Sequence, residues 1–308
     1  MEAKNNRYAV VDLGTNTFHL LVAERGEQHL IHEIYRERQF VKLAEEGIQT
    51  IANAPYQRGI EALSAFAHKI EELHVNSIKV FGTAALRTAS NGEQFIQDVK
   101  QKTGLSIELI TGDEEARLIH LGVGLAVPFD ASKSIIMDIG GGSVEFIIAD
   151  EKRVYWAKSF PVGVAVLFKQ FHHADPITEQ EIAAVNAFLD EQLAPLLLEL
   201  PKHDIKTLIG ASGAFEVVDN MLPQYRQHPL YTLIPIHEYW PLYDDMMPKS
   251  LEERLKTEGL PAKRADLIIV AYLLIYHLLS KTSIQHIAIS AYAVKEGMLS
   301  EMMETNNF

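Results

Sequence analysis

The chain has 308 residues, of which 47% are hydrophobic and 22% charged, a composition typical of a globular protein and a length that suits two domains. It has no cysteine, which excludes a disulfide framework and every thiolate metal site. The formal net charge of −13 argues against a sequence-independent nucleic-acid binder and would repel a polyanionic substrate, unless the site is locally positive or carries a metal.

The N-terminal segment contains two apolar runs separated by a short polar turn. It has no basic stretch followed by an apolar one, so we expect no signal peptide and a cytoplasmic protein. Tyr8 to Ala23 reads YAVVDLGTNTFHLLVA, which predicts a strand, an acid, a turn with glycine and hydroxyl side chains, and a second strand.

Helices and strands then alternate through the first half. Apolar residues at helical spacing predict a helix over Tyr56 to Leu73. The further elements expected are a strand at Ile78 to Gly82, a helix at Asn91 to Lys102 and a strand at Ser106 to Ile110. This alternation predicts an α/β domain.

The next helix opens with TGDEEARLI. Thr111 and Glu114 have the spacing of a capping box, and Asp113 and Arg117 have the spacing of a surface ion pair. Glu115 is left without a local structural task. It is either a solvated glutamate favoured by the helix dipole or a general base that faces a cleft.

A second copy of the N-terminal pattern follows. IIMDIGGGSVEFIIA begins at Ile135, and an offset of 126 residues aligns Asp12 with Asp138 and Gly14 with Gly140. One copy could be a simple hairpin with an acid at its base, but two imply a duplicated domain with paired turns across a cleft. We expect domains at 1–124 and 125–308, and the last helix, about 293–304, could pack back on the first.

The second half repeats the alternation. Five prolines between 223 and 248 mark an irregular or added stretch. The apolar run Leu267 to Leu279 is too short to cross a bilayer and predicts a buried helix. The other expected elements are a helix at about Thr178 to Leu200, strands at Thr207 to Ile209 and Ile287 to Ser290, and a helix at about Ala293 to Met303.

Three segments carry groups suited to phosphate. Small residues in the two turns expose backbone N–H groups and hydroxyls, and the acids beside them could hold a divalent cation through water or merely cap the turns. Arg87 follows a strand, where it could grip phosphate bidentately or be an ordinary surface arginine. The loop Gly210 to Gly213 is a further candidate phosphate or nucleotide loop.

Six stretches together resemble the exopolyphosphatase/guanosine pentaphosphate phosphohydrolase (Ppx/GppA) family of the actin-like ATPase superfamily. They extend from residue 8 to about residue 300 and read DLGTNTFHLLVA, FGTAALRTASN, ITGDEEARLIHLGV, IMDIGGGSVEFIIA, IGASG and GLPAKRADLIIVA. The resemblance implies an α/β fold of two actin-like (ribonuclease H-like) domains with an interdomain cleft. It also implies a homodimer that hydrolyses a terminal phosphoanhydride with Mg²⁺ or another divalent cation.

The resemblance assigns roles to residues at matching positions. Glu115 would activate the attacking water. Asp138 and Glu145 would place the metal and the water, with Asp12 contributing to the metal from the first turn. The phosphate-binding residues that we expect are Gly14, Thr15, Asn16, Arg87, Gly140, Gly141, Gly142, Ser143 and Gly213.

Some positions depart from the family pattern, and the substrate stays open. Lys42-Leu43-Ala44 stands where members carry Arg-Leu-Gly, and Ala291 and Ala293 stand where they commonly carry Asp and Gly. The substrate would be inorganic polyphosphate or guanosine pentaphosphate or tetraphosphate, with no nucleic-acid or membrane partner. The alternatives are an ATP-dependent phosphotransferase of the same superfamily and a sensor that binds guanosine tetraphosphate without turnover.

Overall fold

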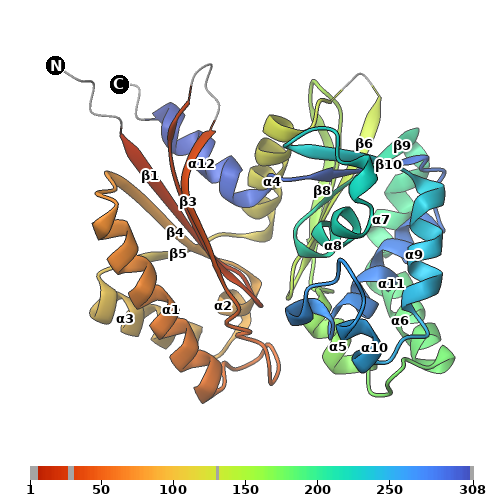
Figure 1. The fold of residues 1–308 in the computed structure, drawn as a ribbon, viewed down its shortest axis with the longest axis horizontal. Coiled ribbons are helices and arrows are strands. Elements are labelled where there is room, and N and C mark those ends of the chain that lie inside the picture. The colour runs from red at the N-terminus through yellow and green to blue at the C-terminus, as the bar shows by residue number, and fades with distance from the viewer. Residues whose placement is uncertain (1–5, 27–30, 130–131, 306–308) are drawn as a thin grey trace. The chain divides into compact units, whose positions relative to one another are not determined.

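A computed structural model describes residues 6–26, 31–129 and 132–305 of the chain (Figure 1). The chain divides into two compact units. Unit 1 comprises Met1–Leu125 and Val294–Phe308, and unit 2 comprises Ala126–Ala293. Across the described residues, no helix is both long enough and apolar enough to cross a membrane.

Unit 1 is built on a five-stranded sheet, sheet A, with the strand order β3-β2-β1-β4-β5. Strands β1, β2 and β3 form an antiparallel meander, and β1, β4 and β5 run parallel. Its elements are β1 (Arg7–Leu13), β2 (Phe18–Arg25), β3 (Ile31–Gln39), α1 (Asn53–Glu72), β4 (Ser77–Gly82), α2 (Ala84–Thr88), α3 (Gly92–Thr103), β5 (Ile107–Leu109), α4 (Gly112–Ala126, whose last residue belongs to unit 2) and α12 (Val294–Thr305).

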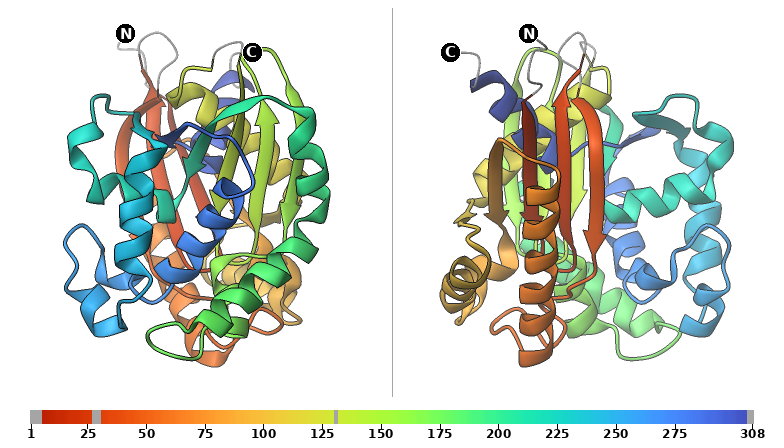
Figure 2. Two further views of the ribbon diagram at one scale, coloured as in Figure 1. Left: turned by 90° about the vertical axis from the view of Figure 1, so that its right-hand side faces the viewer. Right: turned by 60° about the vertical axis from the view of Figure 1, so that its left-hand side comes forward.

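Helices α1 and α3 pack on one face of sheet A, as the orange helices beside the red strands show (Figure 2, right). The period-2 pattern of β1 puts Ala9, Val11 and Leu13 on this face, in one core with Leu63 and Phe66 of α1. Asp12 therefore projects from the opposite face of the sheet.

The C-terminal helix α12 packs against β1 and β3 within unit 1. Arg36 of β3 pairs at 2.9 Å with Glu296, whose side chain is 1% exposed. A Cβ on Gly297 would lie 2.0 Å from the Leu118 carbonyl oxygen of α4. The close crossing of α12 and α4 therefore requires glycine at this position.

Unit 2 contains a six-stranded sheet, sheet B, with the order β10-β11-β9-β6-β7-β8. Its strands are β6 (Lys133–Ile139), β7 (Val144–Ala149), β8 (Val154–Phe160), β9 (Ile205–Ala211), β10 (Tyr231–Pro235) and β11 (His286–Ser290). Its helices are α5 (Val164–Phe171), α6 (Glu179–Gln192), α7 (Ala194–Glu199), α8 (Gly213–Met221), α9 (Tyr239–Met246), α10 (Leu251–Leu255) and α11 (Ile268–Leu279), with short 3₁₀ turns.

Sheet B repeats the topology of sheet A. The meander β6-β7-β8 corresponds to β1-β2-β3, and β9 and β11 lie parallel beside β6 as β4 and β5 lie beside β1. The register is repeated too, because Asp12 pairs with His19 and Asp138 pairs with Glu145. The predicted α/β fold of duplicated, actin-like (ribonuclease H-like) topology is thereby confirmed.

Two segments of unit 2 differ from the sequence-based expectations. The single helix expected over residues 178–200 is divided into α6 and α7, because Pro195 cannot donate a backbone hydrogen bond inside a helix. The proline-marked stretch is more regular than expected. It supplies α9 and the edge strand β10, which pairs antiparallel with β11 and has no counterpart among the described strands of sheet A.

Helix α11 confirms the expected buried apolar helix. Every residue from Ile268 to Leu279 is buried except Tyr276. It belongs to the large core on the face of sheet B that carries Ile135, Met137 and Ile139. Asp138 alternates with these residues and therefore projects from the other face.

Candidate functional site

The two duplicated turns have the same backbone geometry. Gly14 N–H donates to the Thr17 carbonyl at 3.1 Å, and Gly140 N–H donates to the Ser143 carbonyl at 3.0 Å. A Cβ on Gly14 or Gly140 would lie 2.9 Å or 2.8 Å from that carbonyl oxygen. Each turn therefore requires glycine directly after its first strand.

Each turn is held by the segment that follows the third strand of its meander. In unit 1, Lys42 N–H donates to the Asn16 carbonyl at 2.9 Å and Leu43 N–H to the Thr15 carbonyl at 2.8 Å. The stretch Lys42-Leu43-Ala44, which departs from the family pattern, therefore holds the turn through backbone N–H groups. This role does not depend on the side chains. The φ of Lys42 is 51°, so this position favours glycine or asparagine over lysine.

The glycine turn of unit 2 is held in the same way by Gly163, Val164 and Ala165. Their N–H groups donate to the carbonyls of Gly142, Gly140 and Gly141 at 3.2, 3.0 and 2.8 Å, respectively. With the carbonyls engaged, the N–H groups of residues 141–143 find no acceptor among the described residues. Uncommitted N–H groups on a rigid turn are what a phosphate oxygen binds.

Two buried carboxylates lie side by side on adjacent strands of sheet B. Asp138 of β6 pairs directly with Glu145 of β7, and these residues are 5% and 1% exposed. Directly paired residues project from the same face, and like charges placed so destabilise a sheet. Ser159 of β8 pairs with Glu145 in turn, and its Oγ donates to Glu145 Oε1 at 2.6 Å.

The corresponding row of sheet A has a different chemistry. Asp12 pairs with His19 of β2, and His19 pairs with Arg38 of β3. Asp12 is 8% exposed. The acid of the first turn thus shares its row with a basic side chain, whereas the row of sheet B has two acids and a hydroxyl.

This chemistry bears on where a divalent cation would fit. Within the described parts of the chain, no three His, Asp or Glu side chains gather closely enough to hold a metal by themselves. Asp138 and Glu145 remain as a pair of buried, adjacent carboxylates, which suits Mg²⁺ because it binds through one or two carboxylates, water and substrate phosphates. Asp12, the third expected ligand, belongs to unit 1.

The sequence suggested that Glu115 has no local partner, but in the structure Glu115 forms an ion pair with Arg87. Arg87 Nη1 lies 3.1 Å from Glu115 Oε2 and donates to the Ile110 carbonyl at 2.6 Å. Glu115 is 8% exposed. The sequence missed this ion pair because its two residues are 28 positions apart and meet only after β4 and β5 pair in parallel.

The expected contacts of Glu114 and Asp113 are also partly wrong. Glu114 N–H does donate to Thr111 Oγ1, at 3.2 Å, as a capping box requires. The Glu114 carboxylate, however, pairs bidentately with Arg117, at 2.8 and 2.7 Å, and Arg117 also contacts Glu301 of α12. Arg117, which was expected to pair with Asp113, is therefore engaged by two other glutamates, and this ion pair lowers the pKa of Glu114.

The loop from Gly210 to Gly213 lies beside the glycine turn, because Asp138 of β6 pairs with Ala211 of β9. A Cβ on Gly213 would lie 1.3 Å from Arg264 Nη1, so the guanidinium of Arg264 rests on this glycine. Arg264 also pairs with Glu216 of α8 at 2.8 Å. Arg264 lies in the stretch GLPAKRADLIIVA, which resembles the family, but the sequence pattern alone does not identify it as a site residue.

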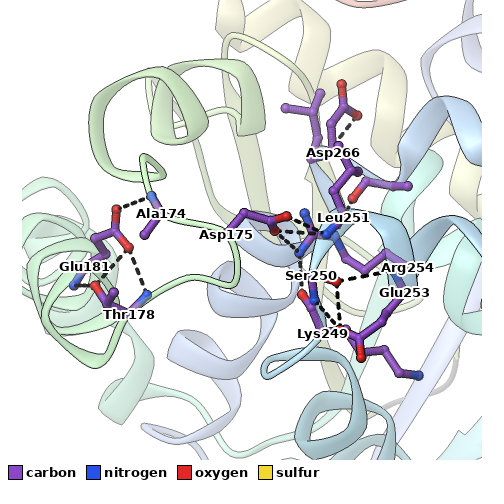
Figure 3. Close-up of polar contacts among 12 residues, drawn as sticks. Ala174, Asp175, Thr178, Glu181, Lys249, Ser250, Leu251, Glu253, Arg254 and Asp266 are labelled. Carbon is purple, nitrogen blue, oxygen red and sulfur yellow. Dashed lines mark hydrogen bonds and ion pairs between the residues drawn. The ribbon is translucent and has the colours of Figure 1, made fainter.

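A buried arginine fixes the segment that carries Arg264 (Figure 3). Arg254 is 1% exposed, and it donates to the carbonyls of Ala265 and Lys249, each at 2.7 Å. Its counter-charge is Asp175, at 3.3 Å, which also accepts from the Leu251 N–H that opens α10. Burial lowers the pKa of Arg254, and Asp175 opposes that shift.

The predicted residues thus form one group in each unit. Unit 1 has Asp12, the turn from Gly14 to Asn16, and the Arg87–Glu115 pair, all near the carboxyl ends of β1, β4 and β5. Unit 2 has Asp138, Glu145, the turn from Gly140 to Ser143, and Gly213, at the corresponding edge of sheet B. Ser159 and Arg264 are the residues that sequence reasoning missed.

Solved structures are similar to the chain over nearly its whole length. An exopolyphosphatase from Cytophaga hutchinsonii is 33% identical and has a TM-score of 0.92, covering 97% of this chain and 98% of its own. A Ppx/GppA family member from Aquifex aeolicus shares the fold, with 23% identity and a TM-score of 0.80 over 98% of this chain and 99% of its own.

Curated relatives are longer. Guanosine-5'-triphosphate,3'-diphosphate pyrophosphatases from Aliivibrio fischeri and Photobacterium profundum are 28% and 27% identical over 299 and 301 residues, which is 96% of this chain. The chain spans 59% of the length of each of them. The model of the Ppx/GppA phosphatase family matches residues 21–306. This chain therefore belongs to the Ppx/GppA phosphatase family.

Proposed function

We propose that this protein is a phosphohydrolase that removes the terminal phosphate of inorganic polyphosphate, the 5'-phosphate of guanosine pentaphosphate, or both. The observation that carries the proposal is the glycine turn of residues 140–143, which offers uncommitted N–H groups. The two strands that this turn connects carry a directly paired set of two buried carboxylates, Asp138 and Glu145. The names of the relatives support both substrates, since one is an exopolyphosphatase and others are guanosine pentaphosphate pyrophosphatases.

The proposed reaction is attack of a water oxygen on the terminal phosphorus. The bond from that phosphorus to the bridging oxygen breaks, the shortened chain leaves, and the water proton passes to the Glu115 carboxylate. In unit 2 the N–H groups of residues 141–143 are suited to hold phosphoryl oxygens, and in unit 1 the Arg87 guanidinium is suited to the same task. Magnesium, when bound beside Asp138 and Glu145, would neutralise phosphate charge, which a chain of net charge −13 otherwise repels.

Phosphate release should be measured from polyphosphate and from guanosine pentaphosphate in parallel, with Mg²⁺ and with excess chelator. We expect release that depends on the divalent cation and is abolished by Asp138→Ala, with an unchanged circular dichroism spectrum. Binding of guanosine tetraphosphate without release from either substrate would contradict hydrolysis and support a sensor. Undiminished activity in chelator would contradict the role of the metal. Homodimer assembly stays a prediction.

A further inference from the structure

The acids of unit 2 occupy the last paired positions but one before the glycine turn. Asp138, Glu145 and Ser159 lie on three adjacent strands, and each is the direct partner of the next. Their side chains consequently project from the same face of sheet B, opposite the large core. Ser159 is the one residue of this row to which the family resemblance gave no task.

The contact between Ser159 and Glu145 has the geometry of a strong hydrogen bond. The oxygen–oxygen distance of 2.6 Å is in the range of a hydroxyl that donates to a carboxylate. Glu145 is 1% exposed, so water cannot easily replace the serine as a donor. A serine hydroxyl has a single proton, and in this structure that proton is committed to Glu145 Oε1.

The direction of the bond matters because of Asp138. Strand β7 lies between β6 and β8, so the bond draws Glu145 Oε1 towards β8 and away from the Asp138 carboxylate. A glutamate side chain has three torsions, and repulsion from Asp138 would not by itself fix them in one rotamer. The Ser159 hydroxyl restrains the Glu145 side chain through this bond.

The segment that carries Ser159 also holds the glycine turn. Strand β8 ends at Phe160, and the N–H groups of residues 163–165 follow within five residues. These N–H groups bind the carbonyls of residues 140–142. A Cβ on Gly163 would lie 2.4 Å from the Gly141 carbonyl carbon, which shows how closely the segment fits the turn. One stretch of chain, residues 159–165, thus fixes both the carboxylate and the turn.

We infer that Ser159 is a positioning residue for the reaction, which holds the Glu145 carboxylate in its working orientation. Ser159 touches no reacting atom in this scheme and acts through Glu145. The inference rests on the proposed function, since Glu145 acts in hydrolysis only if the protein hydrolyses phosphoanhydrides. In unit 1 the corresponding row carries Arg38 in place of the serine, so the restraint belongs to the row with two acids.

A pair of isosteric variants tests the hydroxyl separately from the shape of the side chain. Ser159→Thr keeps the hydroxyl donor and suits a strand. Ser159→Val introduces a side chain of the same shape as threonine but without the donor. Loss of a hydrogen bond to a charged group corresponds to roughly 10–100-fold in rate. We expect kcat to fall by about that factor in Ser159→Val with KM little changed and the melting temperature modestly lowered, and kcat to return close to the wild-type value in Ser159→Thr.

Ser134→Ala is the matched control, because Ser134 is a buried serine of β6 on the same face but four residues from Asp138. Equal kcat values for the Thr and Val variants of Ser159, or a fall in Ser134→Ala as large as in Ser159→Val, would overturn the inference. If the wild-type protein releases no phosphate from either substrate, the proposed function fails. Crystal structures of the Thr and Val variants then decide the positioning role, which is refuted if Glu145 keeps its rotamer in both.

Discussion

Arg87 Nη1 lies 3.1 Å from Glu115 Oε2, so the arginine expected to bind phosphate and the glutamate expected to activate water form an ion pair. The same Nη1 donates to the Ile110 carbonyl. Nε and Nη2 of Arg87 make no hydrogen bond to a residue that the structure describes. Because a guanidinium has five donors in a planar fork, Arg87 can orient Glu115 and still present two nitrogens to a phosphate.

The pairing changes the argument for Glu115 but not the variant that tests it. Glu115→Gln keeps a hydrogen-bond acceptor for Arg87 and removes basicity, so kcat should fall by about 10²–10⁴-fold with KM little changed. Glu114→Gln should retain most activity, because Arg117 keeps its contact with Glu301. Steady-state phosphate release from the two purified variants checks this prediction, and it is wrong if their phenotypes are exchanged or if both stay active.

The second prediction concerns Gly163, which fits against the glycine turn of residues 140–143. A Cβ on Gly163 would lie 2.4 Å from Gly141 C and O and 2.5 Å from Gly142 C. These are backbone atoms, so Gly163→Ala must displace the turn. We expect at least a tenfold loss of kcat/KM and a destabilisation of about 1–3 kcal/mol, as overpacking typically gives, measured by phosphate release and urea unfolding.

A glycine replacement away from the turn provides the control. Gly104 ends α3 with a φ of 76°, and a Cβ there would meet no atom within 4 Å. Asparagine tolerates this left-handed conformation, so Gly104→Asn should leave activity intact. Full activity in Gly163→Ala would show that the turn does not need to be held by residues 163–165.

Much of the fold could be predicted because local patterns and the duplication agree. The repeat of Asp12 and Asp138 at an offset of 126 residues predicted two equivalent strand pairs, and the sheets do share their order and register. The break between α6 and α7 was within reach of the sequence too, since Pro195 marks it. Edge strand β10 was not, because its pairing with β11 joins segments about 55 residues apart.

The candidate site shows a sharper limit. Residue types and spacing along one segment identified the acids and the glycine turns, because those features are local. The partners of the acids come from distant segments: Arg87 reaches Glu115 from another helix, and Ser159 reaches Glu145 from the next strand. Of these, Ser159 could have been found by extending the predicted antiparallel pairing by one strand.

The third prediction tests the buried arginine of unit 2. Arg254→Met fills a similar volume but leaves the carbonyls of Ala265 and Lys249 without their donor and Asp175 without its counter-charge. Breaking such a set should cost about 3 kcal/mol of unfolding free energy, measured by urea unfolding. Asp175→Asn keeps an acceptor for the Leu251 N–H but removes the counter-charge of the buried Arg254, so it should also destabilise the protein. Equal stability of Arg254→Met and the wild type would contradict the role of this network. A loss of activity without a loss of stability would indicate that Arg254 acts through the neighbouring Arg264.

The fourth prediction concerns stability at mildly acidic pH. His277 of α11 is 2% exposed, and its Nδ1 lies 3.1 Å from Asn186 Oδ1. Burial lowers the pKa of His277 to about 4, Lys281 contributes in the same direction, and Asp190 opposes the shift. The ordinary histidine pKa is about 6.5, so between pH 6.5 and 4 the unfolded chain binds a proton that the folded chain does not.

The sign of the pH effect follows from that difference in bound protons. Stability rises with pH wherever the unfolded state binds more protons, so the contribution of His277 is complete above pH 6.5 and is lost as the pH falls towards 4. The loss should be on the order of 1–3 kcal/mol. Urea unfolding at pH 7 and pH 5 should show a smaller decrease in His277→Gln than in the wild type. His68 of α1 is exposed, so His68→Gln should keep the full wild-type decrease; the same decrease in His277→Gln would mean that other groups carry the acid sensitivity.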